Sequence, residues 1–187
     1  SLDPTISMGS IRIPRSIPRR IGEESLLSSF QSATLHERAI LSLGGVIGLR
    51  RVEIATSHPK NRSGNQLLVS GKNGDERLLP LDEVTLDLLI QLEKVQGQTS
   101  FYFPGRFGGD THIHPCTIYK WVREVTGGHN THSLRHRAGS NAYNSTHDIR
   151  AVQELLGHRS VATTQIYSAV EPESLLAVVN ANKLTFS

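Results

Sequence analysis

The stretch "LLGHRSVATTQIYS", residues 155–168, places a histidine directly after a glycine and a tyrosine nine positions later. Gly157 is a favourable helix end, because glycine readily adopts the left-handed conformation that closes many helices. Tyr167 follows within a second helical pattern, where a tyrosine can either pack against a core or carry out chemistry. The polar residues that the rest of the chain supplies decide between these two roles.

The segments around this stretch have helical patterns. Asp148 is a favourable N-cap for a helix that ends at Gly157. The residues expected on the inner face of that helix are Ile149, Val152, Leu155 and Leu156. Ser160 opens the next helix, in which Tyr167 lies beside an apolar stripe formed by Ala162, Ile166 and Val170. One more short helix is expected in the C-terminal tail, over residues 172–182.

Earlier in the chain, apolar residues recur every three or four positions in four segments, which predicts four more helices. A core helix is expected over residues 33–49, and a second helix, capped by Asp82, runs to residue 95. The inner face of this second helix consists of Val84, Leu88, Leu89, Leu92 and Val95. A third helix covers residues 115–125, with Trp121 in the core. Ser133 caps the fourth, which continues through Leu134, Ala138 and Ala142.

Two short apolar runs predict a β-hairpin. The runs "QLLVS" (66–70) and "ERLLPL" (76–81) are joined by "GKNGD", in which the pair Asn73-Gly74 favours a tight turn. Lys72 is expected at the tip of this hairpin. Together the patterns predict a mainly α fold with a small antiparallel β-sheet (α+β).

The length and charge of the chain limit what kind of protein it is. A chain of 187 residues is long enough for one well-packed core. Twenty Lys and Arg residues, a net charge of +3 and a pI of about 9.2 favour a polyanionic partner such as nucleic acid. The single cysteine, Cys116, excludes an internal disulfide framework and fits a reducing compartment. No apolar run reaches transmembrane length and no signal-peptide pattern opens the chain, so we expect a soluble, intracellular protein.

The first residues differ in composition from the rest, which predicts a linker over residues 1–24 and one domain over residues 25–187. Two prolines among four arginines favour an extended strap that either is solvated or lies along phosphates. These arginines, which are candidates for DNA contact, are Arg12, Arg15, Arg19 and Arg20. The chain begins with Ser1 rather than methionine, which is compatible with a fragment of a longer protein and leaves open whether a domain lies upstream.

Six polar groups that occur in a fixed order along the chain indicate a catalytic role for Tyr167. They are Arg50 in "GLRRVEI", Lys72 in "SGKNGDER", His132 and Arg135 in "HSLRH", His158 in "LGH", and Tyr167. In this order the chain resembles the catalytic domain of the tyrosine recombinase family, the phage integrases and their bacterial relatives, from about residue 33 to 170. Each group alone is a weak signal, but the ordered set is specific.

Elementary chemistry agrees with this resemblance. Attack by a tyrosine oxygen on a DNA phosphodiester adds negative charge at phosphorus, and arginine suits that charge because its planar fork binds phosphate oxygens. The resemblance implies that Arg50 and Arg135 clamp the phosphate and that His158 binds it from the other side. A phenol has an unperturbed pKa of ~10, so it needs a proton acceptor or an electropositive pocket.

The remaining roles come from the resemblance. It implies His132 as the proton acceptor, Lys72 as the proton donor to the departing 5′ oxygen, and a 3′-phosphotyrosyl intermediate at Tyr167. No cofactor or metal is needed for this chemistry. Lys60 and Lys94 remain alternatives for the role of Lys72, because the hairpin departs from the family pattern. Asp75 stands where a second lysine is common, and Arg137 where a small hydroxyl residue is usual.

The resemblance also implies partners and a location. It implies double-stranded DNA at a specific recombination site, a homotetramer on paired sites, a monomer as the state without DNA, and the bacterial cytoplasm or nucleoid. Lys120 and Arg123 are further candidates for DNA contact. The C-terminal tail is expected to dock either on its own body or on a neighbouring subunit.

Three other functions remain as alternatives. A type IB topoisomerase uses the same chemistry to nick and reseal one strand, and a non-catalytic DNA-binding module would retain only the fold. A zinc site is the third alternative, since three residues alternate as on a strand and three histidines have loosely ligand-like spacing. The two sets are His112, His114 and Cys116, and His129, His132 and His136.

Overall fold

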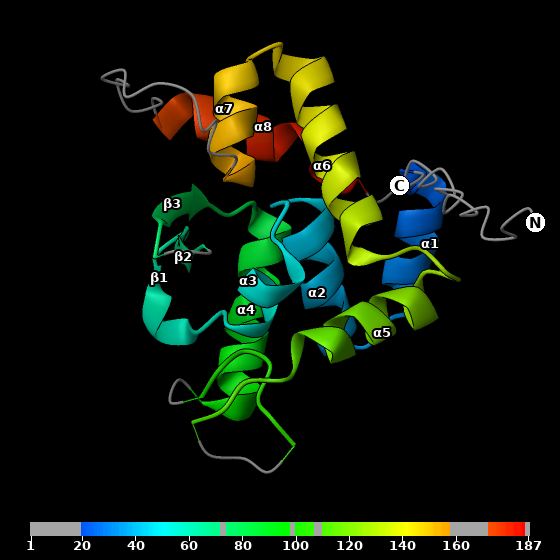
Figure 1. Cartoon of the computed structure of the whole chain (residues 1–187), viewed down its shortest axis with the longest axis vertical. Helices are drawn as coiled ribbons and strands as arrows, with labels where there is room; N and C mark the ends of the chain where they lie inside the picture. The colour runs from blue at the N-terminus through cyan, green and yellow to red at the C-terminus, as the bar shows by residue number, and fades with distance from the viewer. Residues whose placement is uncertain (1–19, 72–73, 98–99, 107–109, 158–171, 186–187) are drawn as a thin grey trace, which may run out of the picture.

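Helices make up most of the part of the chain that the structure describes, and one small sheet lies at their side (Figure 1). The computed structural model describes residues 20–71, 74–97, 100–106, 110–157 and 172–185. The helices are α1 (Glu23–Ser32), α2 (Leu35–Gly45), α3 (Arg51–Ala55), α4 (Glu83–Gln96), α5 (Pro115–Val125), α6 (Thr131–Thr146), α7 (Ile149–Leu156) and α8 (Pro172–Ala181), with a 3-10 turn η1 (Pro59–Asn61). The predicted mainly α fold with a small antiparallel sheet is confirmed. Among the described helices, none combines the length and apolarity needed to cross a membrane.

The sheet has three antiparallel strands in the order β1 (Arg62–Ser63), β2 (Gln66–Ser70) and β3 (Glu76–Pro80). The expected hairpin is confirmed as β2 and β3, whose register pairs Gln66 with Pro80 and Ser70 with Glu76. At its turn end, the Gly71 N–H donates to the Asp75 carbonyl at 2.6 Å. Lys72 and Asn73, expected at the tip, lie outside the described residues.

The core forms around α2, in which every residue from Ala39 to Gly45 is buried. A reciprocal capping box starts α2: the Glu37 N–H donates to Thr34 Oγ1, and the Thr34 N–H donates to the Glu37 carboxylate. The helix ends at Gly45 rather than at residue 49. Beyond it, Leu49 is buried and the chain turns into α3, which the sequence patterns did not indicate. Helix α1 as a whole was likewise not predicted.

The cap predicted for α6 and three residues predicted to be buried need correction. α6 begins at Thr131 because the Asn130 side chain, not Ser133, is the cap: Asn130 Oδ1 accepts the Ser133 N–H at 3.0 Å. Ser133 therefore lies inside the helix. Ile149 and Val95 are 53% and 72% exposed, because the first turn of α7 and the last turn of α4 project beyond the core. Trp121 is only partly buried against the core.

The C-terminal helix α8 packs against α6 and α7 of its own chain (Figure 1). Its inner face buries Val178 and Val179 completely. Behind it, the buried Arg137 side chain donates to the Glu23 carboxylate at 2.6 Å and to the Gly45 carbonyl at 2.7 Å. Arg137 also donates to the Asn182 carbonyl at 3.3 Å. One arginine therefore ties α1, α2 and the end of α8 together.

Candidate active site

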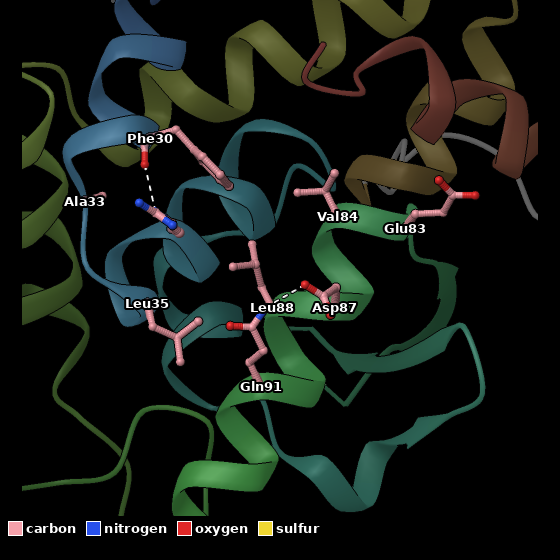
Figure 2. A pocket seen from close by; sticks show the side chains of 9 residues that line it. Phe30, Ala33, Leu35, Glu83, Val84, Asp87, Leu88 and Gln91 are labelled. Carbon is pink, nitrogen blue, oxygen red and sulfur yellow. Dashed lines mark hydrogen bonds between the residues drawn. The ribbon is translucent and has the colours of Figure 1, made fainter. Parts of the chain in front are cut away.

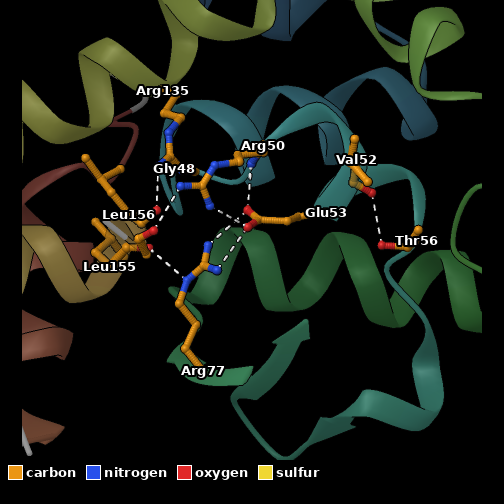
Figure 3. A network of polar contacts seen from close by, with 10 residues as sticks. Gly48, Arg50, Val52, Glu53, Thr56, Arg77, Arg135, Leu155 and Leu156 are labelled. Atoms are coloured by element: carbon orange, nitrogen blue, oxygen red, sulfur yellow. Dashed lines mark hydrogen bonds and ion pairs between the residues drawn. The ribbon is translucent and has the colours of Figure 1, made fainter. Parts of the chain in front are cut away.

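Three arginines from distant parts of the chain meet at the C-terminal end of α7 (Figure 3). They donate to three consecutive backbone carbonyls: Arg77 Nε to Leu155 O at 3.2 Å, Arg135 Nη2 to Leu156 O, and Arg50 Nη2 to Gly157 O at 2.9 Å. The last carbonyls of a helix lack partners within the helix and carry the negative end of its dipole. The end of α7 therefore gathers the guanidinium groups in one place.

Arg50 is positioned at the start of α3 by Glu53. Its Nη1 donates to Glu53 Oε1 at 2.8 Å, and its backbone N–H donates to Glu53 Oε2 at 2.8 Å. The Glu53 side chain is 3% exposed, whereas that of Arg50 is 39% exposed. The acid thus holds the arginine from the buried side and leaves part of the guanidinium accessible to a ligand.

Arg77, on β3, is a site residue that the sequence interpretation missed. Its side chain is 7% exposed, and Nη1 and Nη2 donate to the two oxygens of Glu53 at 3.0 and 2.9 Å. Burial alone would raise the pKa of Glu53, but the hydrogen bonds from Arg77 and Arg50 outweigh burial and lower that pKa. The signal that could have found Arg77 is strand alternation, because it shares a face of β3 with the buried Leu79.

Of the two arginines that the sequence predicted, Arg135 is the more deeply buried. It lies in the second turn of α6 and donates to the Gly48 and Leu156 carbonyls. Within the described part of the chain it has no carboxylate partner. Burial, and then the neighbouring charge of Arg50, lowers the pKa of Arg135 to about 10, so the group stays charged at neutral pH.

The local charge balance favours an anion. Three guanidinium groups face one carboxylate, and burial makes their mutual repulsion stronger than it would be in water. A phosphate group would relieve this repulsion and satisfy the donors of Arg50 that face solvent. The arrangement is therefore suited to hold a phosphodiester and to stabilise additional negative charge on it.

The structure brings together Arg50 and Arg135, but it describes only one other predicted catalytic residue. His132 is exposed in the first turn of α6, one turn before Arg135. Lys72, His158 and Tyr167 lie outside the described residues, as does the expected helix after Ser160. In the sequence, His158 directly follows Gly157, whose carbonyl accepts a hydrogen bond from Arg50.

The predicted DNA-contact residues are only partly described. Arg20 is exposed and its Nη1 donates to Asn141 Oδ1 at 3.3 Å. On α5, the exposed Lys120 pairs with Glu124 at 3.9 Å, and the exposed Arg123 lies over the ring of Tyr119, with Cζ 6.0 Å from its centroid. Arg12, Arg15 and Arg19 fall in the part of the chain that is not described.

Three of the histidines considered as zinc ligands make local contacts. His114 Nδ1 accepts the Cys116 N–H at the start of α5, and His136 Nδ1 is 3.3 Å from Ser140 Oγ. His112 Nδ1 lies 2.8 Å from the Ile113 carbonyl oxygen. Over the described residues, no group of three or more His, Cys, Asp or Glu side chains could hold a metal ion.

A groove of about 600 Å³ lies elsewhere, between α1, α2 and α4. Phe30, Leu35 and Leu88 surround it, one from each helix, with Asp87 nearby on α4 (Figure 2). No predicted catalytic residue is among the described residues that line it. The arginine cluster, not this groove, is the candidate active site.

Comparison with known proteins identifies the family of the chain. The model of the phage integrase family matches residues 22–174. The chain belongs to the phage integrase family. Tyrosine recombinase XerD of Vibrio vulnificus is 31% identical to this integrase-family chain over 193 residues, which cover 92% of the chain and 63% of that relative. The chain thus spans less than two thirds of the length of this relative.

Solved structures show the same fold. The integrase from mycobacterium phage Brujita superposes with a TM-score of 0.78 at 23% identity, over 96% of this integrase-family chain and 63% of that protein. A lambda integrase tetramer bound to a Holliday junction superposes with a TM-score of 0.60 at 19% identity, over 81% of this chain and 50% of that one. The resemblance seen in the sequence is thereby confirmed for family and fold.

Proposed function

We propose that this chain is the catalytic part of a site-specific DNA recombinase that cleaves and rejoins strands through a 3′-phosphotyrosyl intermediate. The observation that carries the proposal is the convergence of Arg50 and Arg135 on the end of α7, directly before His158. Two fixed guanidinium groups with an excess of positive charge are what a pentacovalent phosphorus needs. Membership in the phage integrase family supports the same chemistry.

In this mechanism Tyr167 attacks the scissile phosphorus and displaces the 5′ oxygen of the next nucleotide. His132 accepts the phenolic proton, and Lys72 supplies a proton to the departing oxygen. Arg50, Arg135 and His158 hold the nonbridging oxygens, on which charge accumulates in the transition state. The phosphotyrosyl bond conserves the energy of the broken bond, so a 5′ hydroxyl from another strand reverses the step without ATP.

The partner in this proposal is duplex DNA at a recombination site, bound by four copies of the chain. The lambda integrase tetramer on a Holliday junction supports this assembly by likeness of fold. Residues 1–24 act as a basic linker whose arginines follow phosphates, and the catalytic domain covers residues 25–187. Lys120 and Arg123 contact the backbone from α5. The proposed place of action is the bacterial cytoplasm or nucleoid.

The test is a trap for the covalent intermediate. Residues 1–187 are incubated, in the presence of a chelator, with a pool of random-sequence duplexes nicked near one position, so that cleavage releases a short fragment. The proposal predicts protein–DNA adducts that survive denaturation and that disappear in Tyr167→Phe and Arg135→Ala. A chain that binds the pool but never forms an adduct would be a binding module, contrary to the proposal.

The same duplexes distinguish recombination from strand nicking and resealing. When an adduct recovered from the pool is offered a 5′-hydroxyl strand of foreign sequence, a recombinase joins it and yields a hybrid strand. When the released fragment and the foreign strand are offered together, an enzyme of the topoisomerase type rejoins the released fragment at a much higher rate than it joins the foreign strand.

A further inference from the structure

We propose that Arg77 is a positioning residue of the candidate active site, fixing Arg50 through Glu53 and fixing the Gly157 turn through the Leu155 carbonyl. Arg77 is not one of the six groups on which the resemblance rests. The inference rests on the proposed function, since it assigns Arg77 a part in that reaction. Its guanidinium is buried, so it acts through its neighbours and not on the DNA.

The first link runs through Glu53. Its Oε1 accepts hydrogen bonds from Arg50 Nη1 at 2.8 Å and Arg77 Nη1 at 3.0 Å. Its Oε2 accepts the Arg50 backbone N–H at 2.8 Å and Arg77 Nη2 at 2.9 Å. The two-pronged contact from Arg77 prevents rotation of the carboxylate about its last bond. Without it, the hydrogen bonds that remain on the carboxylate come from Arg50 itself, so Glu53 is no longer anchored to β3 and holds the direction of Arg50 less firmly.

The second link runs to the end of α7. Arg77 Nε donates to Leu155 O at 3.2 Å, and the guanidinium lies directly against Gly157. Because Arg50 donates to the Gly157 carbonyl, a shift of this turn moves a contact of Arg50 as well. Arg77 therefore joins β3 both to α3, which Arg50 caps, and to the end of α7, which His158 follows in the chain.

A matched control exists elsewhere in the protein. Arg62 on β1 makes the same two-pronged contact with Glu93 on α4, at 2.7 and 2.6 Å, and the two side chains are 16% and 6% exposed. Loss of Arg62 should therefore cost stability in the way that loss of Arg77 does. If Arg77 served the fold alone, the two losses would have the same effect on the reaction.

The experiment compares Arg77→Met, Arg77→Lys and Arg62→Met with the unaltered chain of residues 1–187. A duplex recovered from the adduct trap is used at saturating concentration, and the rate constant of adduct formation is measured in a single turnover. The dissociation constant for the same duplex is measured separately, and rates are corrected for the folded fraction. We expect Arg77→Met to slow attachment about 100-fold, the size of effect that a misplaced catalytic group produces. The dissociation constant and the Arg62→Met rate stay unchanged.

Arg77→Lys keeps the charge and tests the geometry in a protein that is more certain to fold. It is expected to be slow as well, because an ammonium group cannot make the fork contact with Glu53. A spectroscopic measurement accompanies the kinetics. The side-chain ¹⁵N signals of Arg50 should show that its guanidinium group rotates more freely in Arg77→Lys than in the unaltered chain. The control variant, Arg62→Lys, should leave this rotation restricted.

Two different failures can be told apart. If the unaltered chain forms no adduct, the proposed function fails and the role of Arg77 falls with it. If the unaltered chain forms adducts and both Arg77 variants react as fast as Arg62→Met at equal folded fraction, only the inference is overturned.

Discussion

Gly157 lies so close to Arg77 that a methyl group on its Cα would approach Arg77 Nη1 to 2.9 Å and Cζ to 3.0 Å. Gly157 also has φ +59°, a conformation that side chains disfavour. Its hydrogen is therefore required both by the backbone and by the packed guanidinium.

The first prediction follows from this contact. Gly157→Ala is expected to destabilise the protein by about 2–3 kcal/mol, from left-handed strain plus displacement of Arg77. Gly64 provides the control, because it has the same φ of +59° and a methyl group on its Cα would meet nothing within 4 Å. Gly64→Ala should cost only about 1 kcal/mol. Equal losses in urea unfolding would show that the contact with Arg77 carries no energy.

A second prediction concerns the charge of Glu53. Glu53→Gln keeps the shape but leaves the buried Arg77 without a counter-charge, so we expect a loss of about 3 kcal/mol in the free energy of unfolding. Glu124→Gln is the control, since its pair with Lys120 spans 3.9 Å between side chains that are 61% and 73% exposed. That change should cost less than about 0.5 kcal/mol. A similar loss in both variants would contradict the importance of the buried pair.

The third prediction is a pH dependence. The pKa of Glu53 is lowered in the folded protein from its ordinary value of 4.5, because hydrogen bonds from Arg77 and Arg50 outweigh the opposing effect of burial. The unfolded state therefore binds more protons in this range, so stability rises with pH. The contribution is fully present above pH 4.5 and is lost as the pH falls through the folded pKa. Unfolding by urea between about pH 3 and 7 should show a shallower acid loss in Glu53→Gln.

The fourth prediction concerns the C-terminal helix. Arg137→Met removes the donor that serves the Gly45 and Asn182 carbonyls, so we expect a loss of about 2 kcal/mol. Hydrogen exchange should show that α8 loses protection before α2 does. Lys183→Met is the control, because its contact with Glu83 at 3.4 Å lies on the surface. Unaltered protection of α8 in Arg137→Met would mean that apolar packing alone holds this helix.

Much of the fold could be predicted because its signals are local. Asp82 and Asp148 cap the helices that follow them, Pro115 starts α5, and the hairpin pairs as its apolar runs indicate. A cap or a turn depends on a few neighbouring residues, so the sequence alone can show it. Asn130 and Ser133 are both good caps, however, and only the packing of α6 selects Asn130.

The missed features depend on contacts between distant residues. Arg77 is buried against two partners, Glu53 and the Leu155 carbonyl. They lie 24 and 78 positions away from it in the chain. Strand alternation places Arg77 on the same face of β3 as the buried Leu79, but no residue near Arg77 in the chain indicates which partners it meets there. Arg50 and Arg135 were predicted only because a family resemblance supplied the long-range information. Their convergence at α7 is visible in the structure alone.

The most direct test of the central claim is to identify both ends of the trapped adduct. After nuclease and protease digestion, mass spectrometry identifies the modified residue, and end-labelling of the released strand identifies its terminus. The account predicts a phosphate that joins Tyr167 to a 3′ nucleotide, and a free 5′ hydroxyl on the released fragment. Attachment through another residue, or a released fragment that carries a 5′ phosphate, would contradict it.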